Sequence, residues 1–225
     1  LVVLLKDIIW FFYYIIFYKM RNWPEVVFSR IYKEKAWGDE GDFFSGDGAL
    51  PENTLKYRKF IEKFIEEKNI KSVVDLGCGD FRVSREINWV NVRYTGVDVV
   101  KSLIERNNKF YSNQKIRFIK KNIIKDELPD ADLCLIKETL QHLPNKDIKK
   151  ILEKIKKYKY VLITDCLPRN ITKKINVDIS MGKHRKYGLY LESPPFNIKI
   201  KEVLKYPKKD KEETIRTILL ENKTN

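Results

Sequence analysis

From Lys71 onward, short apolar runs alternate with polar segments that have helical spacing. The predicted strands are SVVDLG, YTGVDVV, IRFIKKN, ADLCLIK and KYVLITD, and the predicted helices are RVSREIN (82–88), KSLIERNNKFY and NKDIKKILEKIKKY. This alternation predicts an α/β fold, with a parallel sheet and helices on both faces. Residues 201–207 and 214–221 are separated only by a charged turn, and predict an antiparallel hairpin.

Two glycines and two carboxylates surround the end of the first predicted strand, in SVVDLGCGD. In an open parallel sheet, ligands bind beyond the carboxyl ends of the strands. Gly77 and Gly79 have no side chains there, so the backbone can approach a ligand closely. Asp98 ends the next strand, where a carboxylate can accept both hydroxyls of a ribose. Together these residues predict a cofactor that contains a nucleoside.

The charge of Asp80 separates two kinds of nucleoside cofactor. A dinucleotide fold presents GxGxxG and a helix N-terminus to a pyrophosphate. Here Asp80 follows Gly79, and its carboxylate would repel a phosphate. It suits a cofactor with positive charge, such as the amine and sulfonium of S-adenosylmethionine.

The run DLGCGD, from Asp75, resembles the [DE]xGxGxG motif of the class I S-adenosylmethionine-dependent methyltransferases, with Phe81 in place of the third glycine. The segments IYKEKAWG, SGDGALPENT, LQHLPN and LESPPFNI resemble a subfamily often associated with polysaccharide and glycan biosynthesis. The resemblance runs from about residue 28 to the C-terminus. It implies a Rossmann-like sheet of seven strands, mostly parallel, with an antiparallel C-terminal hairpin and helices on both faces.

The resemblance also implies which residues contact S-adenosylmethionine. Gly77 and Gly79 would face its methionine part, Asp75 would order the amine, and Asp98 would bind the ribose. Asn122 stands where the family usually has an Asp that accepts from the adenine amino group, which an Asn carbonyl can also do. The expected cofactor-binding set is Asp75, Gly77, Cys78, Gly79, Asp98, Val99, Asn122 and Ile123.

A general base is expected beside the methyl donor, because a sugar hydroxyl is a poor nucleophile until its proton is removed. His142 follows the predicted fourth strand and Asp165 ends the predicted fifth. Neighbouring strand ends would bring the two residues to one cleft, where Asp165 could orient His142 as the catalytic base. The alternative is that His142 caps the following helix and Asp165 shapes a turn.

Acceptor contacts are expected from the end of the fourth strand and from the insertion at about 167–200, which would cover the acceptor. The candidates for substrate binding are Glu138, His184, Arg185, Tyr187 and Phe196. The aromatic members could instead be ordinary core residues, and Glu138 could lie in a solvated loop. The Ser45-Gly46-Asp47-Gly48 segment is either a lid over the cofactor or a plain linker.

Composition divides the chain into three parts. Residues 1–22 are apolar and aromatic, residues 23–70 predict a helical and loop cap, and residues 71–225 predict the methyltransferase domain. The first segment reaches the ~20 residues of a membrane span only by including Lys6 and Asp7. Membrane contact and packing against the domain are therefore both open. The expected location is cytoplasmic, with possible attachment to the cytoplasmic face of a membrane.

The remaining composition limits other readings. The three cysteines are far apart and the chain has two histidines, so neither a disulfide framework nor a metal site is expected. The net charge of +14 is spread among interleaved acids, which is typical of solvated helix faces. The leading hypothesis is O-methylation of a sugar or glycan hydroxyl. RNA or protein methylation and an inactive cofactor-binding scaffold are the alternatives; intact Gly77, Gly79 and Asp98 argue against the scaffold.

Overall fold

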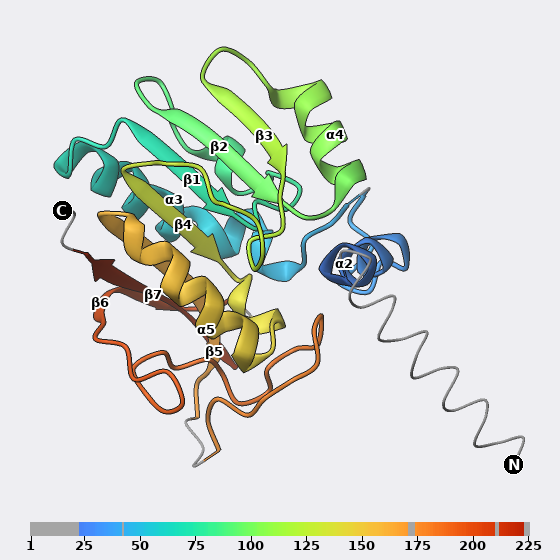
Figure 1. Ribbon diagram of the computed structural model, residues 1–225, viewed down its shortest axis with the longest axis vertical. Coiled ribbons are helices and arrows are strands. Elements are labelled where there is room, and N and C mark those ends of the chain that lie inside the picture. Colours follow the sequence, from blue (N-terminus) through green and yellow to red (C-terminus); the bar gives the residue numbers. More distant parts are fainter. Residues whose placement is uncertain (1–22, 42, 171–173, 210–211, 223–225) are drawn as a thin grey trace, which may run out of the picture.

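The computed structural model describes residues 23–41, 43–170, 174–209 and 212–222. Their centre is a seven-stranded sheet with the order β3-β2-β1-β4-β5-β7-β6 (Figure 1). The strands are β1 (Ser72–Leu76), β2 (Arg93–Asp98), β3 (Ile116–Lys120), β4 (Leu133–Lys137), β5 (Tyr160–Pro168), β6 (Lys201–Pro207) and β7 (Glu213–Glu221). The first five are parallel, and β7 is antiparallel to both β5 and β6. The predicted α/β sheet and its terminal hairpin are confirmed.

Helices cover both faces of this sheet. They are α2 (Trp23–Lys33), α3 (Pro51–Glu67), α4 (Lys101–Tyr111) and α5 (Asn145–Lys154). One apolar core joins α3 and α4 to the sheet, and a second joins α5 and the segment after β5 to the other face. Because α3 contributes fully buried residues such as Ile61 to the first core, part of the 23–70 segment belongs to the core of the sheet.

The topology creates one switch point. The central strand β1 pairs with β2 on one side and with β4 on the other, so the connections that leave these strands turn in opposite directions. A crevice forms beyond the carboxyl ends at such a point. The residues that follow β1, β2 and β4 are therefore brought together there.

The helix expected over 82–88 is absent, and this prediction is wrong. Only a single 3-10 turn, η2 (Ser84–Glu86), forms between β1 and β2. The indole Nε1 of Trp89 donates to the Ser84 carbonyl at 2.6 Å, and the Ser84 hydroxyl donates to Asp75 at 2.8 Å. These two side-chain contacts engage the carbonyl and the hydroxyl of Ser84 and hold the segment in a compact turn.

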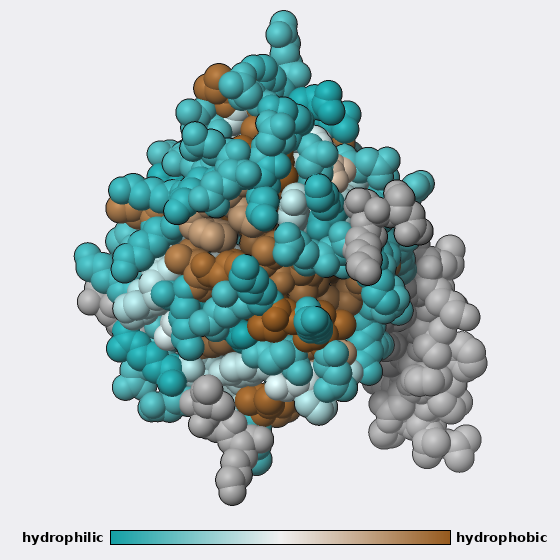
Figure 2. Space-filling view, turned by 90° about the vertical axis from the view of Figure 1, so that its left-hand side faces the viewer, coloured by the Kyte–Doolittle hydropathy of each residue, from teal (hydrophilic) through white to brown (hydrophobic). Residues whose placement is uncertain are grey.

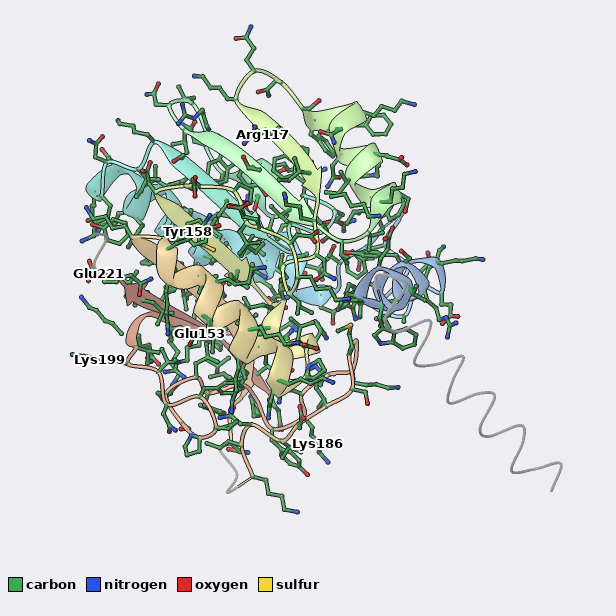
Figure 3. All side chains as sticks on the ribbon, viewed as in Figure 1. Arg117, Glu153, Tyr158, Lys186, Lys199 and Glu221 are labelled. Atoms are coloured by element: carbon green, nitrogen blue, oxygen red, sulfur yellow. The ribbon has the colours of Figure 1, made fainter. Side chains whose placement is uncertain are left out.

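The insertion between β5 and β6 contains no regular helix or strand in its described residues, 169–170 and 174–200. It packs on the α5 face through Leu189, Leu191 and Phe196. Its charged side chains Lys186 and Lys199 lie on the outside of the fold (Figure 3). The insertion thus has an apolar inner side and a charged outer side.

Charge is distributed over the surface, as the interleaved sequence predicts. Hydrophilic residues cover most of the face in Figure 2, with apolar residues gathered near its centre. None of the helices in the described part of the chain is long and apolar enough to cross a membrane. The predicted membrane contact concerns residues 1–22, which lie outside the described residues.

Phe81 occupies a backbone conformation that favours glycine. Its φ is +64°, and it stands at the position of the third glycine in the family motif. The side chain is buried, with ring centroids 4.8 Å from Phe118, 5.1 Å from Tyr94 and 5.4 Å from Tyr111. Aromatic packing therefore compensates for a strained left-handed residue.

Replacement of Phe81 should separate these two effects. We expect Phe81→Ala to lower the free energy of unfolding by ~3–5 kcal/mol, because the packing is lost and a side chain remains at positive φ. Phe81→Gly loses the same ring but relieves the left-handed strain, and should cost about 1 kcal/mol less. Urea denaturation of both variants measures the difference. A Gly variant less stable than the Ala variant would contradict the strain.

Candidate active site

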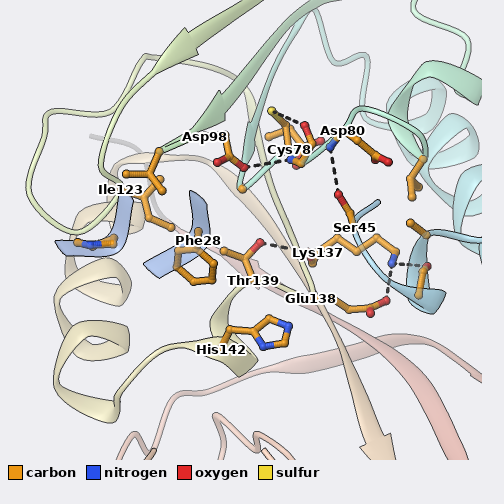
Figure 4. Close-up of a pocket in the computed structure, with 18 of the residues that line it drawn as sticks. Phe28, Ser45, Cys78, Asp80, Asp98, Ile123, Lys137, Glu138, Thr139 and His142 are labelled. Carbon is orange, nitrogen blue, oxygen red and sulfur yellow. Dashed lines mark hydrogen bonds and ion pairs between the residues drawn. The ribbon is translucent and has the colours of Figure 1, made fainter. Parts of the chain in front are cut away.

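A pocket lies at the carboxyl ends of β1, β2 and β4 (Figure 4). All eight residues predicted to bind the cofactor line it: Asp75, Gly77, Cys78, Gly79, Asp98, Val99, Asn122 and Ile123. They come from three separate segments of the sequence, which the parallel sheet brings to one edge. We call this the cofactor pocket.

The two glycines are required by close packing and by backbone conformation. Gly77 has φ +84° and Gly79 has φ +55°. A Cβ on Gly77 would lie 2.3 Å from the Thr139 hydroxyl oxygen, and one on Gly79 would lie 2.6 Å from that of Ser45. The turn after β1 can therefore adopt this packing only with glycine at both positions, and it presents backbone rather than side chains to a ligand.

Asp98 is held at the end of β2 by backbone N–H groups. Gly79 N donates to Oδ2 at 3.2 Å and Val100 N donates to Oδ1 at 3.0 Å. Burial raises the pKa of Asp98 to about 6, although these N–H groups oppose the shift. At neutral pH the carboxylate is ionised and can accept hydroxyl hydrogen bonds, as a ribose site requires.

Asp75 lies deeper than Asp98, near the end of β1. The Ser84 hydroxyl and the Tyr94 phenol both donate to its Oδ2, at 2.8 and 2.7 Å. Burial raises the pKa of Asp75, and the two hydroxyl donors and Lys137 oppose this shift. Because both donors end on Oδ2, Oδ1 is the oxygen left to order an amine.

Asn122 and Ile123 form the opposite wall. The Asn122 Oδ1 accepts from Ile124 N at 3.0 Å, and Asp126 accepts from Asn122 N at 2.8 Å. This turn presents Ile123 to the pocket, across from Cys78 (Figure 4). A carbonyl oxygen has a second lone pair, so Asn122 Oδ1 can still accept from an adenine amino group.

Asp80 does not act as the sequence argument assumed. Its carboxylate accepts from Arg82 N and Arg82 Nε, each at 3.1 Å. The guanidinium neutralises the charge that was expected to repel phosphate. The preference for a cationic cofactor therefore rests on the buried carboxylate of Asp75. This carboxylate, the bare glycine turn and the Asp98 carboxylate fit S-adenosylmethionine.

The cover of the cofactor pocket comes from residues that sequence reasoning mostly missed. Phe28 and Tyr32 of α2 line it, as do Trp37 and Ser45. The Ser45 hydroxyl lies 3.0 Å from the Tyr32 hydroxyl and accepts from Asp80 N at 3.1 Å. The Ser-Gly-rich segment thus packs on the glycine turn. The sequence signal was the aromatic spacing of IYKEKAWG.

A second, more open pocket adjoins the first; we call it the outer pocket. Five residues line both pockets, and they are Trp37, Ser45, Gly48, Glu138 and His142. The outer pocket is otherwise polar, with Gln141, His184, Lys208, Glu212 and Glu213 among its lining residues.

His142 lies at the junction of the two pockets, on the 3-10 turn η3 (Leu140–His142). Its Nδ1 is 3.2 Å from the Lys183 carbonyl oxygen, and its ring centroid is 5.1 Å from that of Trp37. A carbonyl only accepts, so Nδ1 carries the proton and Nε2 is the acceptor. Burial lowers the pKa of His142 to about 4, which keeps the ring neutral.

The structure does not pair His142 with Asp165. Strand β5 continues to Pro168, so Asp165 lies within it. The side chain of Asp165 lines a small cavity with Leu189, Arg216 and apolar residues on the α5 face of the sheet. Among the interactions of the described residues, no hydrogen bond or ion pair joins Asp165 to His142. Burial raises the pKa of Asp165 to about 8. The Lys183 carbonyl, not Asp165, orients the imidazole.

Glu138 and Lys137 form a partly buried ion pair at the end of β4. Lys137 Nζ also donates to the Gly48 carbonyl at 2.9 Å. Burial raises the pKa of Glu138, but the positive charges of Lys137 and Lys208 outweigh it and lower the pKa below its ordinary value. Glu138 has φ +51°; such strain is common at functional sites. Its carboxylate faces both pockets and stays ionised.

The insertion residues divide into two groups. His184 lines the outer pocket, 4.0 Å from Glu213. Arg185 is buried and donates to the carbonyls of Leu143 and Val177, which ties the insertion to the start of α5. Phe196 belongs to the apolar core, and neither pocket is lined by Tyr187. The placement favours a structural role for Arg185 and Phe196.

Metal binding finds no support in the part of the chain that the structure describes. It contains no cluster of three or more His, Cys, Asp or Glu residues arranged to hold an ion. The pKa of the Cys78 thiol is raised well above its ordinary value by burial and by the carboxylates of Asp98 and Asp75. Cys78 is therefore a neutral packing residue in the pocket wall.

Comparison with known proteins agrees with this site. Residues 73–158 match the family described as "Methyltransferase domain". Comparison with curated proteins gives no match. The N-methyltransferase NodS from Bradyrhizobium japonicum WM9, in complex with S-adenosyl-L-homocysteine, has a TM-score of 0.62 and 12% identity, over 87% of this chain and 98% of that chain.

Two other solved structures share the fold. Magnesium protoporphyrin IX methyltransferase from Synechocystis PCC 6803 has a TM-score of 0.59 and 8% identity, over 89% of this chain and 99% of that chain. The methyltransferase domain of bacterial CtHen1 has a TM-score of 0.56 and 14% identity, over 75% and 98%. With this domain match over residues 73–158, this fold and this pocket, the chain is an enzyme that carries a methyltransferase domain and uses S-adenosylmethionine.

Proposed function

We propose that this enzyme methylates a hydroxyl of a sugar or glycan, with His142 as the general base. The observation that carries the proposal is the shared wall of the two pockets, where Trp37, Glu138 and a neutral His142 meet. S-adenosylmethionine supplies the methyl group in an in-line displacement. The chain aligns the acceptor and removes its proton.

The lining of the outer pocket suits a polyhydroxylated acceptor. Trp37 offers an aromatic face, and Glu138, Glu213 and Gln141 offer hydrogen-bond acceptors for hydroxyl groups. Lys208 donates to Glu213 at 3.0 Å, so its charge is already paired. A pocket with these groups can bind a neutral sugar by stacking and hydrogen bonds.

The neutral imidazole supports proton removal from a hydroxyl. The Lys183 carbonyl fixes the tautomer that leaves Nε2 as the proton acceptor. Gln141 Nε2 lies 3.5 Å from this atom, a weak contact that a hydroxyl can replace. Once protonated, the ring would lie near the ionised Glu138, whose charge favours the imidazolium.

The charges of the residues that line the outer pocket do not favour RNA as the acceptor. Nucleic acids are bound largely through phosphates by Lys and Arg. The outer pocket instead carries four acidic side chains, Asp47, Glu138, Glu212 and Glu213, with Lys208 as its lysine. The net charge of +14 is therefore not concentrated where the acceptor would enter.

Cofactor binding should depend on Asp98. We expect Asp98→Ala to weaken S-adenosylmethionine binding by ~1–3 kcal/mol, because ribose hydroxyls lose their buried acceptor. Isothermal titration calorimetry measures the change. Asp130→Ala, at an exposed site paired with Lys157, is the matched control. Equal affinities for wild type and Asp98→Ala would show that the ribose does not bind there.

Turnover should depend on His142 and hardly on Asp165. We expect His142→Ala to lower kcat by ~10²–10⁴ with little change in cofactor affinity, as for loss of a general base. Asp165→Asn should leave kcat within about threefold, because Asp165 does not contact the imidazole. His184→Ala, which removes the other histidine of the outer pocket, serves as the control. Normal turnover of His142→Ala on a sugar that the wild-type enzyme methylates would show that His142 is not the base.

The pH profile provides an independent check on the same residue. A base must be unprotonated, so activity falls as pH drops through its pKa. Because burial lowers the pKa of His142 from 6.5 to about 4, the acid limb of kcat/KM for the acceptor, measured at saturating S-adenosylmethionine, should lie near pH 4. A limb near 6.5 would contradict this role for the buried His142.

A further inference from the structure

An arginine-lined cavity lies on the far side of the glycine turn from the outer pocket. Four arginines line it, Arg58, Arg82, Arg85 and Arg106, together with Glu40, Asp80 and Glu86. Only Ala49 and Asp80 are shared with the cofactor pocket. The cavity is thus adjacent to the methyltransferase site but separate from it, and neither the proposed acceptor nor the proposed base uses it.

Arg58 is the unexplained group of this cavity. Its side chain is 15% exposed, and its nearest carboxylate oxygen, in Glu86, is 3.6 Å from Nη1. Nε is buried without a hydrogen-bond partner, and Arg58 makes no hydrogen bond to any described residue. A largely buried guanidinium has five N–H donors, and leaving them unmet is costly.

The surroundings add positive potential. Four arginines and three carboxylates line the cavity. Both carboxylate oxygens of Asp80 accept hydrogen bonds from Arg82. The N-terminus of α3 also borders the cavity, through Leu50, Pro51 and Thr54. The N-cap residue Leu50 provides no side-chain cap, so the positive end of a 17-residue helix adds to the field.

We propose that this cavity binds a phosphate group, with Arg58 as its principal ligand. Guanidinium forks match phosphate oxygens in pairs, and an uncapped helix N-terminus supports the same charge. Arg82 and Arg85, which are paired with Asp80 and Glu86, line the rest of the wall. The phosphate can be free inorganic phosphate or a group carried by a larger sugar compound, since both offer the same oxygens.

Calorimetric titration of the full chain with inorganic phosphate tests the site. Wild type should bind saturably, with equal ionic strength of sodium chloride as the reference. Arg58→Gln should weaken binding at least tenfold, and Arg58→Lys less, because the charge remains without the fork. Lys63→Gln removes the same charge from the same helix at a side chain that is 72% exposed, and should change binding less than twofold.

The outcomes decide the proposal and the source of the phosphate. Absence of saturable binding by wild type, or equal weakening in Arg58→Gln and Lys63→Gln, overturns it. If Arg58→Gln does not fold, Arg85→Gln, whose side chain is 45% exposed, should still weaken binding, and unchanged affinity there overturns the site. A hexose 1-phosphate that binds tenfold more tightly than phosphate identifies a carried group, and equal affinities identify free phosphate.

Discussion

The turn after β1 depends on one carbonyl. Val97 O, near the end of β2, accepts from both Gly77 N, at 2.8 Å, and Cys78 N, at 3.0 Å. These bonds carry the β1–β2 ladder one step past the strand and then turn the chain. Gly79 N consequently meets the Asp98 carboxylate, and the glycine backbone forms the floor of the cofactor pocket. The remainder of the site is arranged around this turn.

Buried and partly buried carboxylates are the second constraint. Each has lost contact with water, so it needs hydrogen-bond donors or a positive charge from the protein. Asp75 is held by two hydroxyls and Asp98 by backbone N–H groups, whereas Glu138 is held by Lys137. The direction of the pKa shift depends on the partner of each carboxylate. The pKa of Asp98 is raised by burial, and that of Glu138 is lowered by its lysine neighbours. One pocket thus combines acceptors of different strength with a neutral His142.

The short turn η1 (Asp47–Ala49) separates the three cavities. Gly48 lines the cofactor pocket and the outer pocket, and Ala49 lines the cofactor pocket and the arginine-lined cavity. A Cβ on Gly48 would lie 1.9 Å from a Glu138 carboxylate oxygen, so the turn can approach β4 only as glycine. The N-terminal segment is therefore a shared wall of the site as well as its cover.

Local patterns in the sequence were sufficient to predict the parallel sheet, its terminal hairpin and a set of residues that line one pocket. Strand alternation, Gly77, Gly79 and the spacing to Asp98 reflect constraints that act within a few residues or along adjacent strands. The helix expected over 82–88 was predicted wrongly, because the Ser84 carbonyl accepts from Trp89 and the Ser84 hydroxyl donates to Asp75, and these side-chain contacts favour a compact turn.

The tertiary structure decided what surrounds the methyl donor. Antiparallel pairing with β7 extends β5 to Pro168, which places Asp165 inside a strand whose alternation turns its side chain to the α5 face. The partner of His142 is a backbone carbonyl of the insertion, which no side-chain pattern can signal. The neutralisation of Asp80 by Arg82 and the position of Arg58 likewise depend on how distant segments pack. The sequence alone determined the sheet and the residues of the cofactor pocket, because their rules are local. Packing determined the surroundings of His142, the outer pocket and the arginine-lined cavity.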